Sequence, residues 1–162
     1  MSRAMPLSQL LAGQPLLPPG FDPAITGLSA DSRELAPGGA FVALAGERTH
    51  GLRHAPAGAA AILFEAPAPA DLPLPANAIA VPGLRGRQGE LADRFYDAPS
   101  RALAVAGVTG TNGKTSTVQL ITQALALDGV GAGSIGTLGA GLHGQVVPGE
   151  RTTPDVIAVH RL

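Results

Sequence analysis

The residues with the clearest potential for chemistry form one glycine-rich turn. Residues 110–115 read Gly-Thr-Asn-Gly-Lys-Thr and lie between a continuously apolar segment and an amphipathic one. Backbone N–H groups in such a turn, together with the N-terminus of a following helix, can bind phosphate oxygens. Gly110 and Gly113 allow positive φ and a close approach to a ligand. Lys114 would lie along the β- and γ-phosphates, and the Thr115 hydroxyl would coordinate Mg²⁺.

The lysine of this turn is the only lysine in the chain, and the other ten of the 11 basic residues are arginines. A compact ammonium group can enter a phosphate cradle in which a planar guanidinium group does not fit. The strict phosphate-loop pattern requires glycine at position 108, where this chain has Val108. The turn is therefore a variant, and a glycine-rich connection without a ligand is the alternative interpretation.

Residues 108–115 resemble the phosphate loop of the Mur ligases, the ATP-dependent amide ligases of peptidoglycan synthesis, which typically carry Gly-Thr-Asn-Gly-Lys-Thr. Other segments resemble one branch of that family, the MurE type, which adds the third residue of the stem peptide. In chain order they are Asp31-Ser-Arg33 with Pro37-Gly38, Phe41-Val-Ala43 and Gly46, then Phe95-Tyr-Asp-Ala-Pro-Ser100, Ile135-Gly-Thr-Leu-Gly139 and Thr152-Thr-Pro-Asp155. The resemblance covers residues 24–162. It departs at His50-Gly51-Leu52, where family members usually carry Asp-Gly-His.

The resemblance implies an enzyme that adds the third amino acid to UDP-N-acetylmuramoyl-L-alanyl-D-glutamate through an acyl phosphate, with ATP and Mg²⁺ as cofactors. The partners would be that UDP-linked dipeptide and a free amino acid, and the full-length protein would be a monomer. Diaminopimelate, lysine and ornithine all remain open as the amino acid added. Carried over by position, Lys114 would be catalytic; Gly110, Thr111, Asn112, Gly113, Lys114, Thr115 and Ser116 would bind ATP; Ser32, Glu47, Arg48, Thr49, Thr152 and Thr153 would bind the substrate; and Thr115 would bind the metal.

Simpler roles compete with these assignments. Ser32 could cap a turn, Arg48 could be a solvated surface charge, and Thr153 could serve only as a helix N-cap. We expect Asp31 and Arg33 to pair with each other or with the backbone rather than to contact a ligand. Other functions also stay open: another phosphate-loop ligase, of the MurF or folylpolyglutamate-synthetase kind, or a nucleotide-binding module without catalysis.

The elements that must position these residues follow from the hydrophobic pattern. It predicts short strands over 24–30, 39–45, 59–64 and 78–81, a surface loop over 66–75 and a helix over 84–96. Beyond residue 100 it predicts a buried strand over 102–108, a helix over 114–127, strands over 130–138 and 145–148, and a helix with Thr153 as N-cap and Pro154 at its first position.

The predicted fold class is α/β. We expect a small amino-terminal α/β domain over 1–98 that binds the UDP-linked substrate, followed over 99–162 by the beginning of a parallel-sheet ATPase domain. On the resemblance, a modified lysine, further metal ligands and a carboxy-terminal domain would lie beyond Leu162.

Composition excludes several other classes of protein. The formal net charge is −1, which argues against a nucleic-acid binder with a broad basic surface. The chain has no cysteine, and its 4 histidines are scattered without metal-ligand spacing. No apolar run approaches the ~20 residues of a membrane span. The first 20 residues lack the apolar region of a signal peptide, so we expect a cytoplasmic protein.

Overall fold

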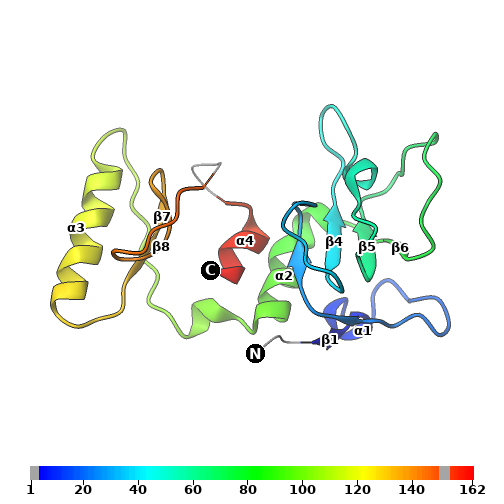
Figure 1. Ribbon diagram of the computed structural model, residues 1–162, viewed down its shortest axis with the longest axis horizontal. Coiled ribbons are helices and arrows are strands. Elements are labelled where there is room, and N and C mark those ends of the chain that lie inside the picture. The colour runs from blue at the N-terminus through cyan, green and yellow to red at the C-terminus, as the bar shows by residue number, and fades with distance from the viewer. Residues whose placement is uncertain (1–3, 150–153) are drawn as a thin grey trace. The chain divides into compact units, whose positions relative to one another are not determined.

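The computed structural model describes residues 4–149 and 154–162. It divides into two compact units, Met1–Pro99 (unit 1) and Ser100–Leu162 (unit 2) (Figure 1). The fold is mixed α/β with a parallel sheet, as the sequence predicts. Among the described residues no helix has both the length and the apolar character that crossing a membrane requires.

A four-stranded parallel sheet organises unit 1. Its strands are β3 (Leu28–Ser29), β4 (Ala40–Ala43), β5 (Ala61–Phe64) and β6 (Ala78–Ala80), and they pair in that order. Every residue of β4 and β5 is buried, as expected for central strands covered on both faces. The strand predictions over 39–45, 59–64 and 78–81 are confirmed within a few residues at each end.

The strand predicted over 24–30 is divided between two sheets. Its first part, β2 (Ala24–Ile25), pairs antiparallel with β1 (Met5–Pro6), whereas β3 joins the main sheet. Between the two parts, the Thr26 N–H donates to the Gly38 carbonyl at 3.0 Å. The Thr26 hydroxyl donates to the Pro37 carbonyl at 3.3 Å. These contacts commit Thr26 to the Pro-Gly turn, so the chain leaves one sheet before it enters the other.

The main helix of unit 1 is α2 (Leu84–Tyr96), which has the predicted bounds. It ends at Asp97, whose φ of +66° is left-handed. Arg94 attaches it to α1 (Leu7–Leu10), because its Nη1 donates to the Leu10 carbonyl at 2.6 Å. The 3₁₀ turn η1 (Gly51–His54) also belongs to this unit, and a second one, η2 (Pro99–Arg101), spans the boundary between the two units. Residues 66–75 form no helix or strand, which confirms the loop prediction.

The core of unit 1 lies on both faces of the sheet, because neighbouring strand residues point to opposite faces. Alternate residues of β4 and β5 pack on one face with Leu52 of η1; that cluster consists of Phe41, Ala43, Leu52, Ala59, Ile62 and Phe64. Fully buried side chains elsewhere in the unit include Leu7, Leu10, Ile25, Leu28, Val42, Leu63, Val81, Leu84 and Leu91. The sheet therefore gives the loops at its edges a rigid base.

Unit 2 contains α3 (Lys114–Leu127), β7 (Gly133–Gly136), β8 (Gly139–Leu142) and α4 (Val156–Arg161). The bounds of α3 agree with the predicted helix. The predicted strand over 102–108 is wrong: this segment is irregular, with Leu103 64% and Val105 77% exposed. A parallel strand requires a hydrogen-bonded neighbour, and the described part of unit 2 pairs only β7 with β8.

The carboxy-terminal predictions also need correction. β7 lies within the strand predicted over 130–138, but its partner is β8 at 139–142 rather than a strand over 145–148. The two form an antiparallel hairpin, and Val147 makes only an isolated bridge to Ala140. Glycine permits this, because a Cβ at Gly139 would lie 2.0 Å from the Val147 carbonyl oxygen. The N-cap of α4 is Asp155 rather than Thr153: its Oδ1 accepts from the amides of Ile157 and Ala158 at 2.9 and 3.0 Å.

Candidate functional site

The glycine-rich turn of unit 2 has the backbone conformation that its glycines predict. Gly110 has a φ of +146° and Gly113 a φ of +79°, both in regions that side chains rarely adopt. Lys114 lies over the turn, and its Nζ donates to the carbonyl oxygens of Gly110 at 2.5 Å and Thr111 at 3.4 Å. The ammonium group is thus already held at the mouth of the turn.

The first turn of α3 supplies further donors. The earliest helical hydrogen bond runs from the Thr117 amide to the Gly113 carbonyl at 2.8 Å, so the amides of residues 114–116 precede it. The side chains of Thr111, Asn112, Lys114, Thr115 and Ser116 are all exposed. The amides at the start of α3, one ammonium group and several hydroxyls form a donor set that suits a polyphosphate.

The turn offers fewer groups to a metal ion than to a phosphate. Among the described residues no three or more His, Cys, Asp or Glu side chains lie together as metal ligands. Among the oxygens of this turn, the Thr115 hydroxyl is the one that the sequence resemblance assigns to the metal. Because Mg²⁺ in nucleotide sites is bound through phosphate oxygens and water with few protein ligands, one hydroxyl is compatible with it.

A second candidate site lies at the carboxyl edge of the parallel sheet in unit 1. The register pairs Ser29 of β3 with Phe41 of β4, so the segments that follow both strands emerge at the same edge. Ser32 follows β3, and residues 46–49 follow β4. Loops at this edge of a parallel sheet commonly bind ligands.

The turn after β3 is organised by Asp31. Its Oδ1 accepts from the Arg33 amide at 2.9 Å, and its Oδ2 accepts from the Arg33 Nη2 at 2.6 Å. This confirms the expected pairing of Asp31 with Arg33. It also shows that Asp31, rather than Ser32, caps the turn. The half-buried Ser32 has no side-chain hydrogen bond to the residues that the structure describes, so its hydroxyl is available to a ligand.

The loop after β4 is a tight hairpin. The Gly46 amide donates to the Thr49 carbonyl at 3.0 Å, and an isolated bridge pairs Ala45 with His50. Two glycines permit this shape. A Cβ at Gly46 would meet the Thr49 carbonyl oxygen at 2.8 Å, and one at Gly51 would meet the Ala43 Cα at 2.9 Å. The hairpin presents Glu47, Arg48 and Thr49 to solvent.

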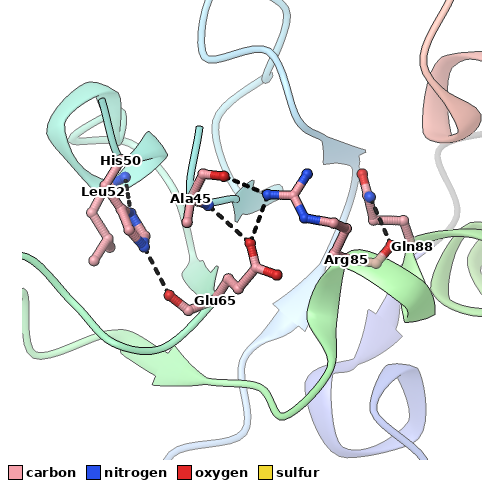
Figure 2. Close-up of polar contacts among 6 residues, drawn as sticks. All are labelled: Ala45, His50, Leu52, Glu65, Arg85 and Gln88. Atoms are coloured by element: carbon pink, nitrogen blue, oxygen red, sulfur yellow. Dashed lines mark hydrogen bonds and ion pairs between the residues drawn. The ribbon is translucent and has the colours of Figure 1, made fainter. Parts of the chain in front are cut away.

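The base of this hairpin is held by three residues that the sequence reasoning did not assign to the site (Figure 2). The Glu65 Oε2 accepts from the Ala45 amide at 3.0 Å and from the Arg85 Nη2 at 2.9 Å. Arg85 also donates to the Ala45 carbonyl. His50 contacts the Leu52 amide and the Glu65 carbonyl. One signal was present in the sequence: an arginine at the start of a predicted helix, where a cation opposes the helix dipole.

Comparison with known proteins follows the same division of the chain. The family model described as "Mur ligase family, catalytic domain" matches residues 24–96, and "Mur ligase middle domain" matches residues 108–162. The chain belongs to the Mur ligase family. The first Mur ligase match includes the sheet edge with its hairpin, and the second begins two residues before the glycine-rich turn.

Curated relatives narrow the branch of the Mur ligases. The chain is 60% identical over 164 residues to the UDP-N-acetylmuramoyl-L-alanyl-D-glutamate–2,6-diaminopimelate ligase of Xanthomonas campestris pv. campestris (strain 8004), covering 99% of this chain and 32% of the relative. It is 54% identical over 165 residues to the ligase of the same name from Xylella fastidiosa (strain 9a5c), with 99% and 33% covered.

A solved structure of a ligase with that name matches with a TM-score of 0.66 and 26% identity, covering 98% of this chain and 32% of that one. The chain thus spans about a third of the length of the curated relatives it matches.

Two predicted substrate residues, Thr152 and Thr153, lie outside the described residues. The other Mur ligase assignments fall into two separate groups. Ser32, Glu47, Arg48 and Thr49 lie at one edge of the unit 1 sheet, and residues 110–116 form the turn of unit 2.

Proposed function

We propose that the protein is an ATP-dependent ligase that adds 2,6-diaminopimelate to UDP-N-acetylmuramoyl-L-alanyl-D-glutamate in the cytoplasm. Identity of 60% across nearly the whole chain to a ligase named for that reaction supports both the substrate and the amino acid. The sequence alone left diaminopimelate, lysine and ornithine open. The relatives' printed names favour the first of these.

In this proposal unit 2 begins the ATP site. A carboxylate oxygen of the substrate forms a bond to the γ-phosphorus of ATP, and ADP leaves. The amine of the incoming amino acid then attacks the acyl carbon and loses a proton, and phosphate leaves. The first step brings anion toward anion, so catalysis depends on positive charge and N–H groups that are already in place.

The chain supplies these groups at the glycine-rich turn. Lys114 would move its Nζ from the Gly110 and Thr111 carbonyls to phosphate oxygens, and the amides of residues 114–116 would bind the same phosphates. Bound Mg²⁺ would neutralise further phosphate charge, with Thr115 as its protein ligand. The observation that carries the proposal is the only lysine of the chain, held over a turn whose two glycines have positive φ.

Unit 1, in this proposal, binds the UDP part of the substrate. The available Ser32 hydroxyl and the exposed Glu47, Arg48 and Thr49 lie at one sheet edge and offer donors, acceptors and a cation to a nucleotide. A nucleotide-binding module without catalysis would share this edge. It would not require the lysine and the glycine conformations of unit 2.

The test is ligation by the chain extended to the length of its relatives. Incubation with the UDP-linked dipeptide, Mg·ATP and diaminopimelate should yield the UDP-linked tripeptide and one ADP per product. Lysine and ornithine in separate reactions should react poorly. ATP-dependent ligation of lysine in preference to diaminopimelate would reject the amino acid assignment, and no ligation of any of the three would reject the activity.

A further inference from the structure

We propose that Glu65 and Arg85 are positioning residues for substrate binding: together they hold the 46–49 hairpin in the conformation that the nucleotide meets. The proposal rests on the function proposed above for unit 1. It adds two residues that lie outside the predicted binding loop and reach its ends through the backbone of Ala45 and through His50.

Backbone hydrogen bonds close the hairpin, including one from the Gly51 amide to the Leu44 carbonyl at 2.8 Å, but no side chain of its own anchors it. All four residues from Gly46 to Thr49 are exposed, and none has an apolar side chain that could enter the core. Fixing a flexible residue costs conformational entropy. If the free loop were disordered, binding would have to provide that free energy, whereas a loop already ordered leaves it for affinity.

Glu65 and Arg85 order the loop by binding both backbone polar groups of Ala45. The carboxylate accepts the Ala45 N–H at 3.0 Å, and the guanidinium group donates to the Ala45 carbonyl while it contacts the carboxylate at 2.9 Å. Figure 2 shows Arg85 reaching from α2 to this point, with Glu65 beside it. Ala45 is the residue from which the hairpin departs, so its orientation sets that of the loop.

Glu65 also holds the other end of the hairpin, through its own backbone. The His50 Nδ1 can only accept from the Leu52 N–H at 3.1 Å, and its Nε2 therefore carries the proton and donates to the Glu65 carbonyl at 2.7 Å. Residue 65 thus binds Ala45 with its side chain and His50 with its main chain. Because the Glu65 amide in turn donates to the Ala43 carbonyl at 3.0 Å, both ends are tied to the sheet.

Stability alone does not account for an arginine at position 85. Arg85 lies in the first turn of α2, which holds no acidic residue, and a cation there is unfavourable to the helix dipole. Its side chain is 56% exposed, and exposed ion pairs contribute little to stability. What Arg85 supplies instead is a donor directed at the base of the hairpin.

The experiment uses the 162-residue chain with three substitutions. Arg85→Met keeps the aliphatic stem and removes the donor. Arg85→Lys is the rescue variant, because a single nitrogen of Arg85 makes both contacts and an ammonium group can replace it. Arg53→Met is the matched control, since it breaks the exposed Arg53–Asp71 pair in the same unit without touching the hairpin.

Two quantities are measured for each variant: the Kd for UDP by calorimetry, and hydrogen exchange at the amides of Ala45 and Gly46 without ligand. We expect Arg85→Met to raise the Kd about tenfold, the equivalent of ordering roughly one residue, and to accelerate exchange at both amides. Arg85→Lys should restore both quantities to within about threefold, and Arg53→Met should change neither. Melting followed by Tyr96, the only tyrosine in a chain without tryptophan, confirms that each variant is folded.

The outcomes separate this proposal from the one it rests on. If the unsubstituted chain does not bind UDP, the function proposed for unit 1 fails. If it binds UDP and Arg85→Met binds equally well, the positioning role fails and the proposed function stands. Weaker binding with unchanged amide exchange would also overturn positioning, because Arg85 would then contact the nucleotide directly.

Discussion

The two units of this chain differ in how completely their strands are paired and their apolar side chains are buried. In unit 1, β4 and β5 each have a parallel neighbour on both sides, and their residues are buried throughout. In unit 2, α3 buries only Thr122, and many large apolar side chains stay exposed: Leu103, Val105, Leu120, Ile121, Leu125, Leu127, Val130, Ile135, Leu138, Leu142 and Val147. Yet each unit carries a well-formed candidate binding feature.

The difference shows that the two features depend on different things. The phosphate turn and α3 are continuous in sequence, so they form from local hydrogen bonds and glycine conformations. α3 contacts β7, but the described part of unit 2 has no parallel sheet. The hairpin of unit 1 depends on residues 20 and 40 positions away, Glu65 and Arg85, which only the folded sheet and α2 bring to Ala45. Substitutions should therefore affect the two units in different ways.

The largest effect should come from Lys114→Ala, measured as ligation by the chain extended to the length of its relatives. Loss of the only ammonium group at the turn should lower kcat by about 10²–10³-fold or more, as for other groups that neutralise developing charge. Lys114→Arg should fail similarly, because the planar guanidinium group does not fit a cradle built for an ammonium group.

The control for this prediction is Arg101→Ala, which removes an exposed cation of unit 2 outside the turn. It should leave ligation nearly unchanged. Near-normal ligation by Lys114→Ala with intact helicity would show that the turn of unit 2 is not the ATP site.

A matched pair of leucines tests the contrast in packing. Leu91 of α2 is 0% exposed and Leu120 of α3 is 65% exposed, so both lie in helices and differ in burial. Leu91→Ala should lower the free energy of unfolding by about 2–5 kcal/mol, whereas Leu120→Ala should change it by less than about 0.5 kcal/mol. Urea titration followed by Tyr96 fluorescence and by circular dichroism measures both. Equal losses would show that α3 is packed as well as α2.

A matched pair of glycines separates backbone strain from ligand binding in unit 2. Gly113 and Gly129 have φ of +79° and +77°, and a Cβ at either would meet no atom within 4 Å. Alanine at each should therefore cost a similar 1–2 kcal/mol, roughly, from left-handed strain. Only Gly113→Ala should raise the KM for ATP in the extended chain. An equal rise for Gly129→Ala would attribute the effect to general destabilisation.

The smallest expected effect is a loss of stability at low pH. The Arg53 guanidinium beside Asp71 lowers the pKa of that carboxyl below 3.8, and hydrogen bonding from Arg94 lowers the pKa of Glu90 below 4.5. Because the folded-state pKa values lie below the unfolded ones, this stabilisation is present above about pH 4.5 and is lost as the pH falls through the folded values. Both groups are in unit 1.

The Tyr96 urea midpoint should therefore decrease slightly between pH 6 and pH 3, and less so in Arg53→Met. An Arg53→Met midpoint that falls as steeply as that of the unsubstituted chain would exclude a contribution from the Arg53–Asp71 pair.

The sequence predicts best those elements that local patterns determine. The helices over 84–96 and 114–127 have the predicted bounds, and the glycines of the phosphate turn have the positive φ expected of them. It fails where the structure depends on a distant partner. The apolar segment 102–108 has the composition of a buried strand but no pairing neighbour in the described part of unit 2.

The candidate site in unit 1 was predictable only in part. Ser32 and the 47–49 loop could be placed by resemblance, and the Asp31–Arg33 pairing by proximity in sequence. The roles of Glu65 and Arg85 could not, because no local pattern links either to Ala45. His50 departs from the family pattern in the sequence, but its contacts with Leu52 and Glu65 depend on the fold.

We expect unit 1 to provide a substrate site by itself, whereas the turn of unit 2 requires more structure to bind ATP tightly. Calorimetric titration of the 162-residue chain with UDP and, separately, with Mg·ATP tests it most directly. We predict measurable heat of binding for UDP and weak or no saturation with Mg·ATP. Tight Mg·ATP binding with no response to UDP would contradict the account, because the autonomous site would then be the glycine-rich turn and the sheet edge of unit 1 would serve another purpose.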